Sequence, residues 1–102
     1  MNNSIKTLLL KCTRFEWDNE NKKKNCLKHN VSNSECEQIF FNRPFIIHFD
    51  GKHSDKEERF YALGHTDLRR KIFIVFTIKD TKIRVLSARD MSQKEKEIYK
   101  QL

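Results

Sequence analysis

Residues 72–76 read Ile-Phe-Ile-Val-Phe, an unbroken apolar run in a chain of 102 residues of which 34% are charged. β-branched and aromatic residues of this kind favour a strand. The run is also far shorter than the roughly 18 apolar residues that a membrane-spanning helix needs. A continuous apolar strand is typical of the centre of a sheet, where other elements cover both of its faces. The run therefore predicts a sheet built around a central strand, and we expect no association with a membrane.

Four further strands are predicted around this central strand. In residues 13–17 and 45–49 apolar residues recur at every second position, as in strands with one buried face. Residues 59–63 and 82–88 supply the other two strands. We expect Gly64 to end the strand at 59–63, and Lys79-Asp80-Thr81 to form the loop of a hairpin that leads into 82–88.

A helix that packs on the core is predicted to begin just after Ser32. Ser32 and Glu35 have the spacing of a capping box, in which each side chain bonds to the backbone of the other residue. Cys36, Ile39 and Phe40 follow at helical spacing and form an apolar stripe. This stripe is expected to dock the helix on the sheet.

Two other helices are predicted from their capping residues. Asp18 can cap a polar helix over about residues 19–29. Ser92 and Glu95 form a second capping box, which opens a charged helix that runs to the C-terminus. The predicted order is β-α-α-β-β-β-β-α, which indicates an α+β domain with a small, largely antiparallel sheet.

The positive charge of the chain is concentrated at its two ends. The chain holds 21 Lys and Arg against 14 Asp and Glu, a formal net charge of +7. Residues 1–30 carry +4 (seven basic, three acidic), residues 31–70 carry −1 (six and seven) and residues 71–102 carry +4 (eight and four). This distribution suits a polyanionic partner such as nucleic acid. A charged surface that only keeps the protein in solution is the alternative.

Size and cysteine content narrow the class of protein further. The length suits one core, so we expect an N-terminal extension at residues 1–12 and a single domain at residues 13–102. Cys12, Cys26 and Cys36 are odd in number and form no Cys-x-x-Cys pair. They are therefore expected to be free thiols in a reducing compartment. A zinc site of Cys26, His29 and Cys36 is the alternative, but the chain offers no further ligand to complete it. We expect a cytoplasmic protein without a metal or another cofactor.

Several short motifs resemble those of one known family. In chain order they are Phe15-Glu16-Trp17-Asp18, Asn25, Lys28-His29, Val31-Ser32, His53-Ser54, Glu58-Arg59-Phe60, Gly64, Ile83-Arg84-Val85, Ser87-Ala88-Arg89, Ser92, Glu95 and Tyr99. Together, from about residue 15 to residue 102, they resemble the BrnT family of toxins. One departure is Asn21, where the family usually carries a lysine four residues after the tryptophan. The adjacent Lys22 is the nearest cation.

The resemblance implies a function that composition and spacing do not show. BrnT toxins are ribonucleases of bacterial type II toxin–antitoxin modules and have a RelE-like fold. A member would cleave RNA and would be neutralised by a BrnA-type antitoxin, a ribbon-helix-helix protein. It would reach operator DNA only through its complex with that antitoxin. The alternative is a non-catalytic module with the same fold that binds nucleic acid or a partner protein.

Cleavage of RNA without a metal needs groups that move protons and cations that stabilise the phosphorane. Arginine matches two phosphate oxygens at once, so Arg59, Arg84 and Arg89 are the candidate phosphate ligands. Ion pairs with Glu16, Asp18 or Glu58 are the alternative for these arginines. His29 is the candidate for proton transfer because its ordinary pKa lies near neutrality. Its alternative is a structural place at the end of the helix over 19–29.

Three residues near the N-terminus are candidates for RNA binding. Lys28 and Lys22 can contact phosphates, although lysines on a polar helix are usually only solvated. Trp17 can stack on a base. Its alternation with Phe15 also fits a place in the core, which is the more common place for such a residue. His48 and His65 are expected at the surface.

Overall fold

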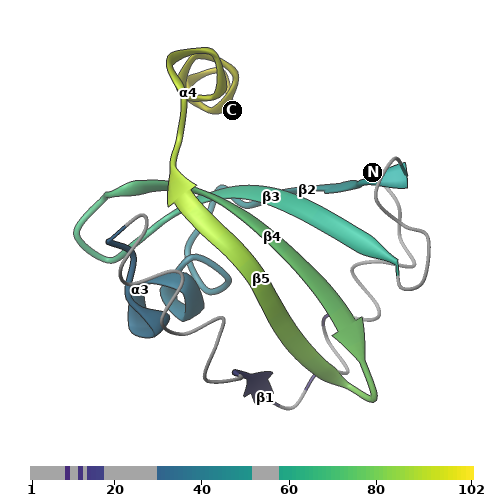
Figure 1. The fold of residues 1–102 in the computed structure, drawn as a ribbon. Coiled ribbons are helices and arrows are strands. Elements are labelled where there is room, and N and C mark those ends of the chain that lie inside the picture. Colours follow the sequence, from purple (N-terminus) through teal and green to yellow (C-terminus); the bar gives the residue numbers. More distant parts are fainter. Residues whose placement is uncertain (1–8, 10–11, 13, 18–29, 52–57) are drawn as a thin grey trace.

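The computed structural model describes residues 9, 12, 14–17, 30–51 and 58–102, and its architecture is α+β (Figure 1). A single five-stranded sheet has the strand order β1-β5-β4-β3-β2. The described elements are β1 (Arg14–Glu16), α3 (Asn33–Gln38), β2 (Ile46–Phe49), β3 (Arg59–His65), β4 (Lys71–Lys79), β5 (Lys82–Asp90) and α4 (Gln93–Lys100).

The sheet is mixed rather than purely antiparallel. β2, β3, β4 and β5 pair antiparallel, whereas β1 pairs parallel with β5. The prediction of an α+β domain with a largely antiparallel sheet is therefore confirmed for the described residues. The polar helix predicted over 19–29 lies outside them. No helix among the described segments is long and apolar enough to cross a membrane.

One face of the sheet packs on α3 and the segment that follows it. Both capping boxes form as predicted, with the Ser32 and Ser92 side chains accepting from the N–H groups of Glu35 and Glu95. Ile39, just after α3, and Phe76 of β4 are fully buried in the main core. Figure 1 shows α3 on one side of the sheet and α4 beyond the end of β5.

Gly64 does not end β3, contrary to the prediction. The strand continues through Gly64 to His65, which pairs with Lys71 of β4. A Cβ atom at Gly64 would lie 3.0 Å from the Cβ of Ile39 and 3.2 Å from a ring carbon of Phe45. Glycine at this position therefore allows the segment after α3 to approach the strand closely, and it does not serve a turn.

The central position of residues 72–76 is confirmed, but the prediction that both faces of this strand are covered holds only in part. β4 lies between β5 and β3, and Ile72, Ile74 and Phe76 are fully buried on the core side. Phe73 and Val75, on the other side, are only half-buried. Phe73 packs against a smaller buried cluster of Leu63, Met91 and Tyr99, so α4 and the segment before it cover one end of the second face. The rest of this face leaves apolar side chains partly open to solvent.

A β-bulge in β5 changes which face its residues occupy. Val75 pairs with Ser87 but the next residue, Phe76, pairs with Val85, so Leu86 is an extra residue in β5. Arg84 and Arg89 are five positions apart and would lie on opposite faces of a regular strand. Because of the extra residue, both lie on the face opposite the main core.

Arg70, just before β4, links α3 to the end of β5. Its Nε donates to Asp90 Oδ1 at 2.7 Å, and its Nη1 donates to Glu35 Oε2 at 3.2 Å and to the Asn30 carbonyl at 2.9 Å. The Arg70 hydrogen bond lowers the pKa of Asp90. The pKa of Glu35 is lowered first by the backbone N–H of Ser32 and then by Arg70. One guanidinium thus holds two carboxylates from distant parts of the chain.

We expect Arg70→Gln to lower the free energy of unfolding by on the order of 1 kcal/mol at neutral pH, because the three groups are partly exposed. Both carboxylates have folded pKa values below their ordinary values. Their stabilising contribution is therefore present above the ordinary carboxylate pKa and is lost as the pH falls through the folded pKa. Urea unfolding of the wild type and of Arg70→Gln, measured from neutral to acid pH, should show that the difference between their free energies of unfolding becomes smaller as the pH falls. Arg69→Gln, in the neighbouring exposed turn, is the control. An equal difference at every pH would contradict this account.

Candidate nucleic-acid interface

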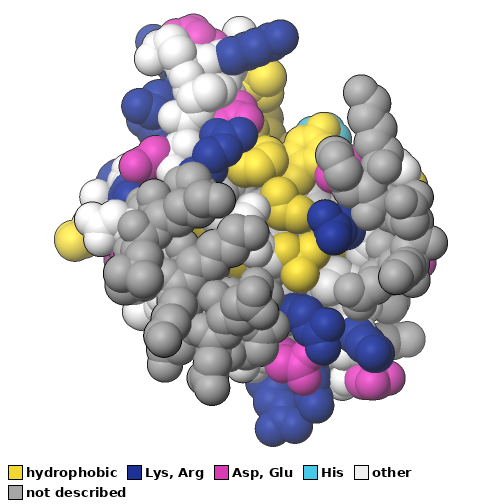
Figure 2. Space-filling view, viewed as in Figure 1, with side chains coloured by type: hydrophobic (Ala, Val, Ile, Leu, Met, Phe, Trp, Pro, Cys, Tyr) yellow, Lys and Arg dark blue, Asp and Glu magenta, His cyan; other side chains and the backbone are white. Residues whose placement is uncertain are grey.

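The face of the sheet opposite α3 carries the candidate site. We call it the open face, and it includes Ile46, His48, Arg59, Tyr61, Phe73, Val75, Thr77, Arg84, Ser87 and Arg89. Figure 2 shows hydrophobic side chains gathered over β3 and β4 below α4, with Lys and Arg side chains at their margins. Alternating strands usually place polar residues on a solvated face, so this apolar surface with a basic margin indicates a binding surface.

Two of the predicted arginines lie in one row across the open face. Arg59 of β3 and Arg84 of β5 both pair with Thr77 of β4, which places them on either side of it. Arg84 pairs on its other side with Glu16 of β1 and donates to its Oε1 from Nε at 3.0 Å and from Nη2 at 2.9 Å. The ion pair that the sequence left open as an alternative is thus present for Arg84. We call Arg59, Thr77, Arg84 and Glu16 the arginine row.

The arginine row is positive although it includes a carboxylate. The hydrogen bond from Arg84 lowers the pKa of Glu16, and the charges of Arg84, Lys82 and Lys79 lower it further. The Lys82 Nζ lies 3.9 Å from Glu16 Oε2. Glu16 therefore faces three cations, Arg84, Lys82 and Lys79, and a phosphate group would meet the same cations here.

The hydroxyl of Thr77 is buried in the middle of this row. Thr77 is 1% exposed, and its Oγ1 has no hydrogen-bond partner among the described residues. Burial of an unpaired hydroxyl is unfavourable compared with burial of a methyl group. A hydroxyl between two arginines can donate to an anion that those arginines bind once the side chains that cover it move aside.

Arg89 lies apart from the arginine row, next to α4. It pairs with Phe73, which is four residues from Thr77 along β4, so it is about 13 Å from the row. Its Nη1 and Nη2 donate to the two carboxylate oxygens of Glu95 at 2.8 and 3.0 Å. This pairing is the first cause of a lowered pKa of Glu95. The structure brings Arg59 and Arg84 together and places Arg89 at the other end of the open face.

Trp17 lies on the other side of the sheet. It is half-buried, packs against the main core and donates from its indole Nε1 to Glu37 Oε2 of α3 at 2.9 Å. These contacts fit the alternative of a core position, which the sequence left open. His29, Lys28 and Lys22 lie outside the described residues.

His65 is half-buried rather than a surface residue as predicted. Its Nδ1 lies 2.7 Å from the Tyr99 hydroxyl, and this hydroxyl donates to the Pro44 carbonyl. A tyrosine has a single hydroxyl hydrogen, so the His65 Nδ1–H must be the donor to Tyr99. His65 therefore helps to hold the end of α4 against the segment before β2.

A ladder of rings crosses the open face, and no pattern in the sequence indicates it. The ring centroids of His48 and Tyr61 are 5.3 Å apart with an interplanar angle of 30°. Those of Tyr61 and Phe73 are 5.7 Å apart at 33°. The guanidinium carbon of Arg89 lies 4.1 Å from the centroid of the Phe73 ring. We call His48, Tyr61, Phe73 and Arg89 the ring ladder. Only the strand register brings these four residues together, so no spacing in the sequence could have indicated them.

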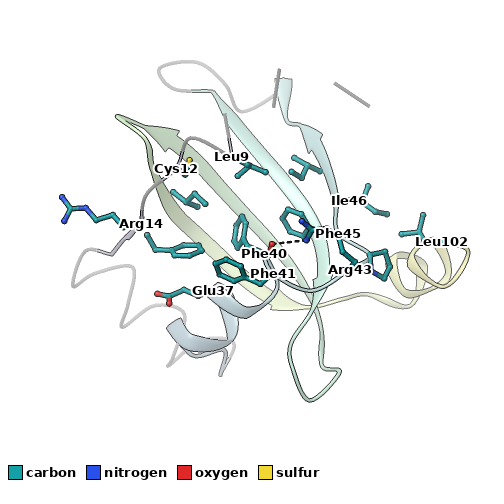
Figure 3. Close-up of a pocket in the computed structure, with 14 residues that line it drawn as sticks. Leu9, Cys12, Arg14, Glu37, Phe40, Phe41, Arg43, Phe45, Ile46 and Leu102 are labelled. Atoms are coloured by element: carbon teal, nitrogen blue, oxygen red, sulfur yellow. Dashed lines mark hydrogen bonds between the residues drawn. The ribbon is translucent and has the colours of Figure 1, made fainter. Parts of the chain in front are cut away.

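A cavity of about 940 Å³ lies mainly on the other side of the sheet and includes only Ile46 of the open face in its lining (Figure 3). It is lined mostly by apolar side chains of β1, of the segment between α3 and β2, and of β2, with the rings of Phe15, Phe40, Phe41 and Phe45 among them. Arg43, at its margin, donates to the Phe40 carbonyl at 3.2 Å. Its apolar lining is less suited to a phosphate than the arginine row is. Across the parts of the chain that the structure describes, no three His, Cys, Asp or Glu side chains are grouped to hold a metal ion.

Comparison with known proteins identifies the family of the chain. Residues 17–95 match the sequence model of the ribonuclease toxin BrnT of type II toxin–antitoxin systems. The chain belongs to the BrnT family. The matched segment includes the whole ring ladder and every residue of the arginine row except Glu16. Family membership supports a ribonuclease activity, an RNA substrate and an antitoxin partner.

A solved BrnT structure has the same fold. The chain is similar to the crystal structure of the ribonuclease toxin BrnT from Brucella abortus. The two superimpose with a TM-score of 0.58 and 20% sequence identity, and the match covers 79% of this chain and 99% of the Brucella chain. At this identity the likeness supports the fold alone. A comparison with curated proteins gives no match.

Proposed function

We propose that this chain is a metal-independent RNA endonuclease that binds the scissile phosphate at the arginine row. The observation that carries the proposal is the placement of Arg59 and Arg84 on either side of the buried, unpaired Thr77 hydroxyl. Two guanidinium groups can donate to the oxygens of a phosphate and of the more negative phosphorane, and the Thr77 hydroxyl can join them once the side chains that cover it move aside.

The reaction uses the nucleophile that RNA itself carries. The 2′-oxygen forms a bond to the adjacent phosphorus and gives up its proton to a base. The bond from phosphorus to the 5′-oxygen breaks, and that oxygen takes up a proton, which leaves a 2′,3′-cyclic phosphate and a 5′-hydroxyl. His29 is our candidate for proton transfer. Lys28 and Lys22 are candidates for contacts with neighbouring phosphates, and Arg89 would bind the chain further along the open face.

The test of this proposal is cleavage of labelled RNA by the purified full chain in excess EDTA. We expect cleavage to continue and to yield 2′,3′-cyclic phosphate ends. An RNA with a 2′-deoxyribose at the cleaved position should resist. Loss of cleavage in EDTA, or cleavage of the 2′-deoxy substrate, would contradict the mechanism.

We propose that the antitoxin is a ribbon-helix-helix protein of the BrnA type. The chain would reach operator DNA only in its complex with that antitoxin. Co-expression with the product of the adjacent gene should restore growth and RNA integrity to cells that express the toxin. Growth arrest that the neighbouring product does not relieve would contradict this part of the proposal.

A non-catalytic binding module is the second candidate function. It is favoured by the ion pairs that engage Arg84 with Glu16 and Arg89 with Glu95. In that case the open face would bind RNA or a partner protein without cleaving RNA. Binding of RNA with no cleavage by the folded protein would support this second function over the first.

A further inference from the structure

We infer that the ring ladder binds an unpaired nucleobase, which restricts the toxin to single-stranded RNA. This inference rests on the proposed function, because it assigns the base of the same nucleic acid whose phosphate the arginine row would bind. The geometry of the ladder, its exposure and its distance from the arginine row carry the argument.

The ladder ends at an edge of the sheet with its last ring exposed. His48 belongs to β2, the edge strand of the sheet, and its side chain is exposed. Tyr61 packs against one face of the His48 ring, and no described strand lies beyond the other face. A planar base stacked there would continue the series of rings from Phe73 through Tyr61 to His48. Stacking of this kind tolerates every base because each has a π-face.

The ladder lies close enough to the arginine row for one RNA strand to reach both. Tyr61 follows Arg59 by two positions on β3, so both are on the open face with about 7 Å between their Cα atoms. The stacking site beyond His48 is one strand further from the row, so the base bound there belongs to a nucleotide near the one whose phosphate the row binds. Bases inside a duplex expose no ring face, so this arrangement selects unpaired RNA.

The other end of the ladder is held in place by charge. Arg89 lies over the Phe73 ring and is itself fixed by two hydrogen bonds to Glu95 of α4. Phe73 and Tyr61 are half-buried, so they lose little rotational freedom when a base binds. The ladder is thus a pre-formed platform rather than a set of mobile side chains.

The test compares two non-cleavable probes with the full-length protein: a short 2′-O-methyl oligonucleotide and the same backbone without bases. We expect Tyr61→Leu combined with His48→Ala to weaken binding of the oligonucleotide about 10-fold or more, as loss of base stacking does. Binding of the abasic backbone should not change. Tyr61→Phe, which keeps the ring, should bind the oligonucleotide as the wild type does.

Phe41→Leu is the matched control, since Phe41 is 76% exposed and lines the cavity instead of the open face. Circular dichroism of each variant checks that it is folded. Unchanged oligonucleotide affinity in the double variant would overturn the inference and leave the phosphate site intact. Loss of antitoxin binding with unchanged oligonucleotide affinity would overturn it in favour of a protein contact. A wild-type protein that binds neither probe would overturn the proposed function as well.

Discussion

Replacement of Arg84 by alanine is expected to slow RNA cleavage on the order of 100-fold without unfolding the protein. Removal of one fixed donor to a developing negative charge has an effect of this size in other enzymes. Arg84 is 32% exposed and its ion-pair partner Glu16 is 37% exposed, so loss of the pair should alter stability only slightly. Single-turnover cleavage of a labelled RNA measures the effect on the chemical step.

Three further variants test whether the arginine row acts as a unit. Arg59→Ala should slow cleavage to a similar degree, and the double variant should lose less than the product of the two single effects. Arg84→Lys keeps the charge without the planar fork and should restore little activity. Thr77→Val should slow cleavage about 10-fold while leaving stability unchanged or higher, because it replaces an unpaired buried hydroxyl with a methyl group.

Arg69→Ala is the matched control for the arginine row. Arg69 is exposed in the turn between β3 and β4, at the opposite end of these strands from Arg59. The Arg69→Ala variant loses the same positive charge as Arg84→Ala but should cleave RNA at nearly the wild-type rate. Cleavage at the wild-type rate by folded Arg84→Ala protein would show that the phosphate binds elsewhere.

Much of the fold could be predicted from the sequence because its signals are local. The capping boxes at Ser32 and Ser92 depend on residues three positions apart, and both form as predicted. The apolar run at 72–76 is long enough to define the centre of the sheet. The role of Gly64 was missed because it depends on Ile39, which is distant in sequence and close only after the sheet has formed.

The candidate site was harder to predict because it depends on register. The arginines could be chosen by residue type, but their grouping could not. A one-residue bulge at Leu86 determines that Arg84 and Arg89 share a face. Glu95 was predicted as a capping residue, and nothing local indicated that it would also hold Arg89. The ring ladder needs one residue from each of four strands, so its members look like ordinary strand residues in the sequence.

The open face also explains why residues 72–76 are less buried than their apolar sequence predicts. Phe73 and Val75 have the residue types of a strand that is covered on both faces, yet they are half-buried on the side that bears the arginines. A contiguous apolar patch on a solvated face is typical of a binding surface. The departure from the predicted burial therefore lies at the surface where we place the function.

Replacement of Phe76 by alanine is expected to lower the free energy of unfolding by about 3–5 kcal/mol, the cost typical of a large cavity in a packed core. Phe76 is fully buried, and its ring centroid lies 5.1 Å from that of Phe40 and 5.7 Å from that of Phe60. Small domains have a free energy of unfolding of about 5–15 kcal/mol in total. Much of the variant should therefore be unfolded at the temperature at which cells are grown to express it. Urea denaturation followed by fluorescence measures the loss, with Phe41→Ala as the exposed control.

Phe76→Ala should lose RNA cleavage because less of the protein is folded, and not because the cleavage site is changed. Phe76 points into the main core, away from the arginine row, although it is the neighbour of Thr77 on β4. Any loss of cleavage by Phe76→Ala should therefore follow the unfolded fraction and be restored by a stabilising osmolyte. The loss in Arg84→Ala should not respond to the osmolyte, because that protein is already folded. If the osmolyte left Phe76→Ala folded but inactive, the core would be setting the alignment of the arginine row as well as holding the sheet together.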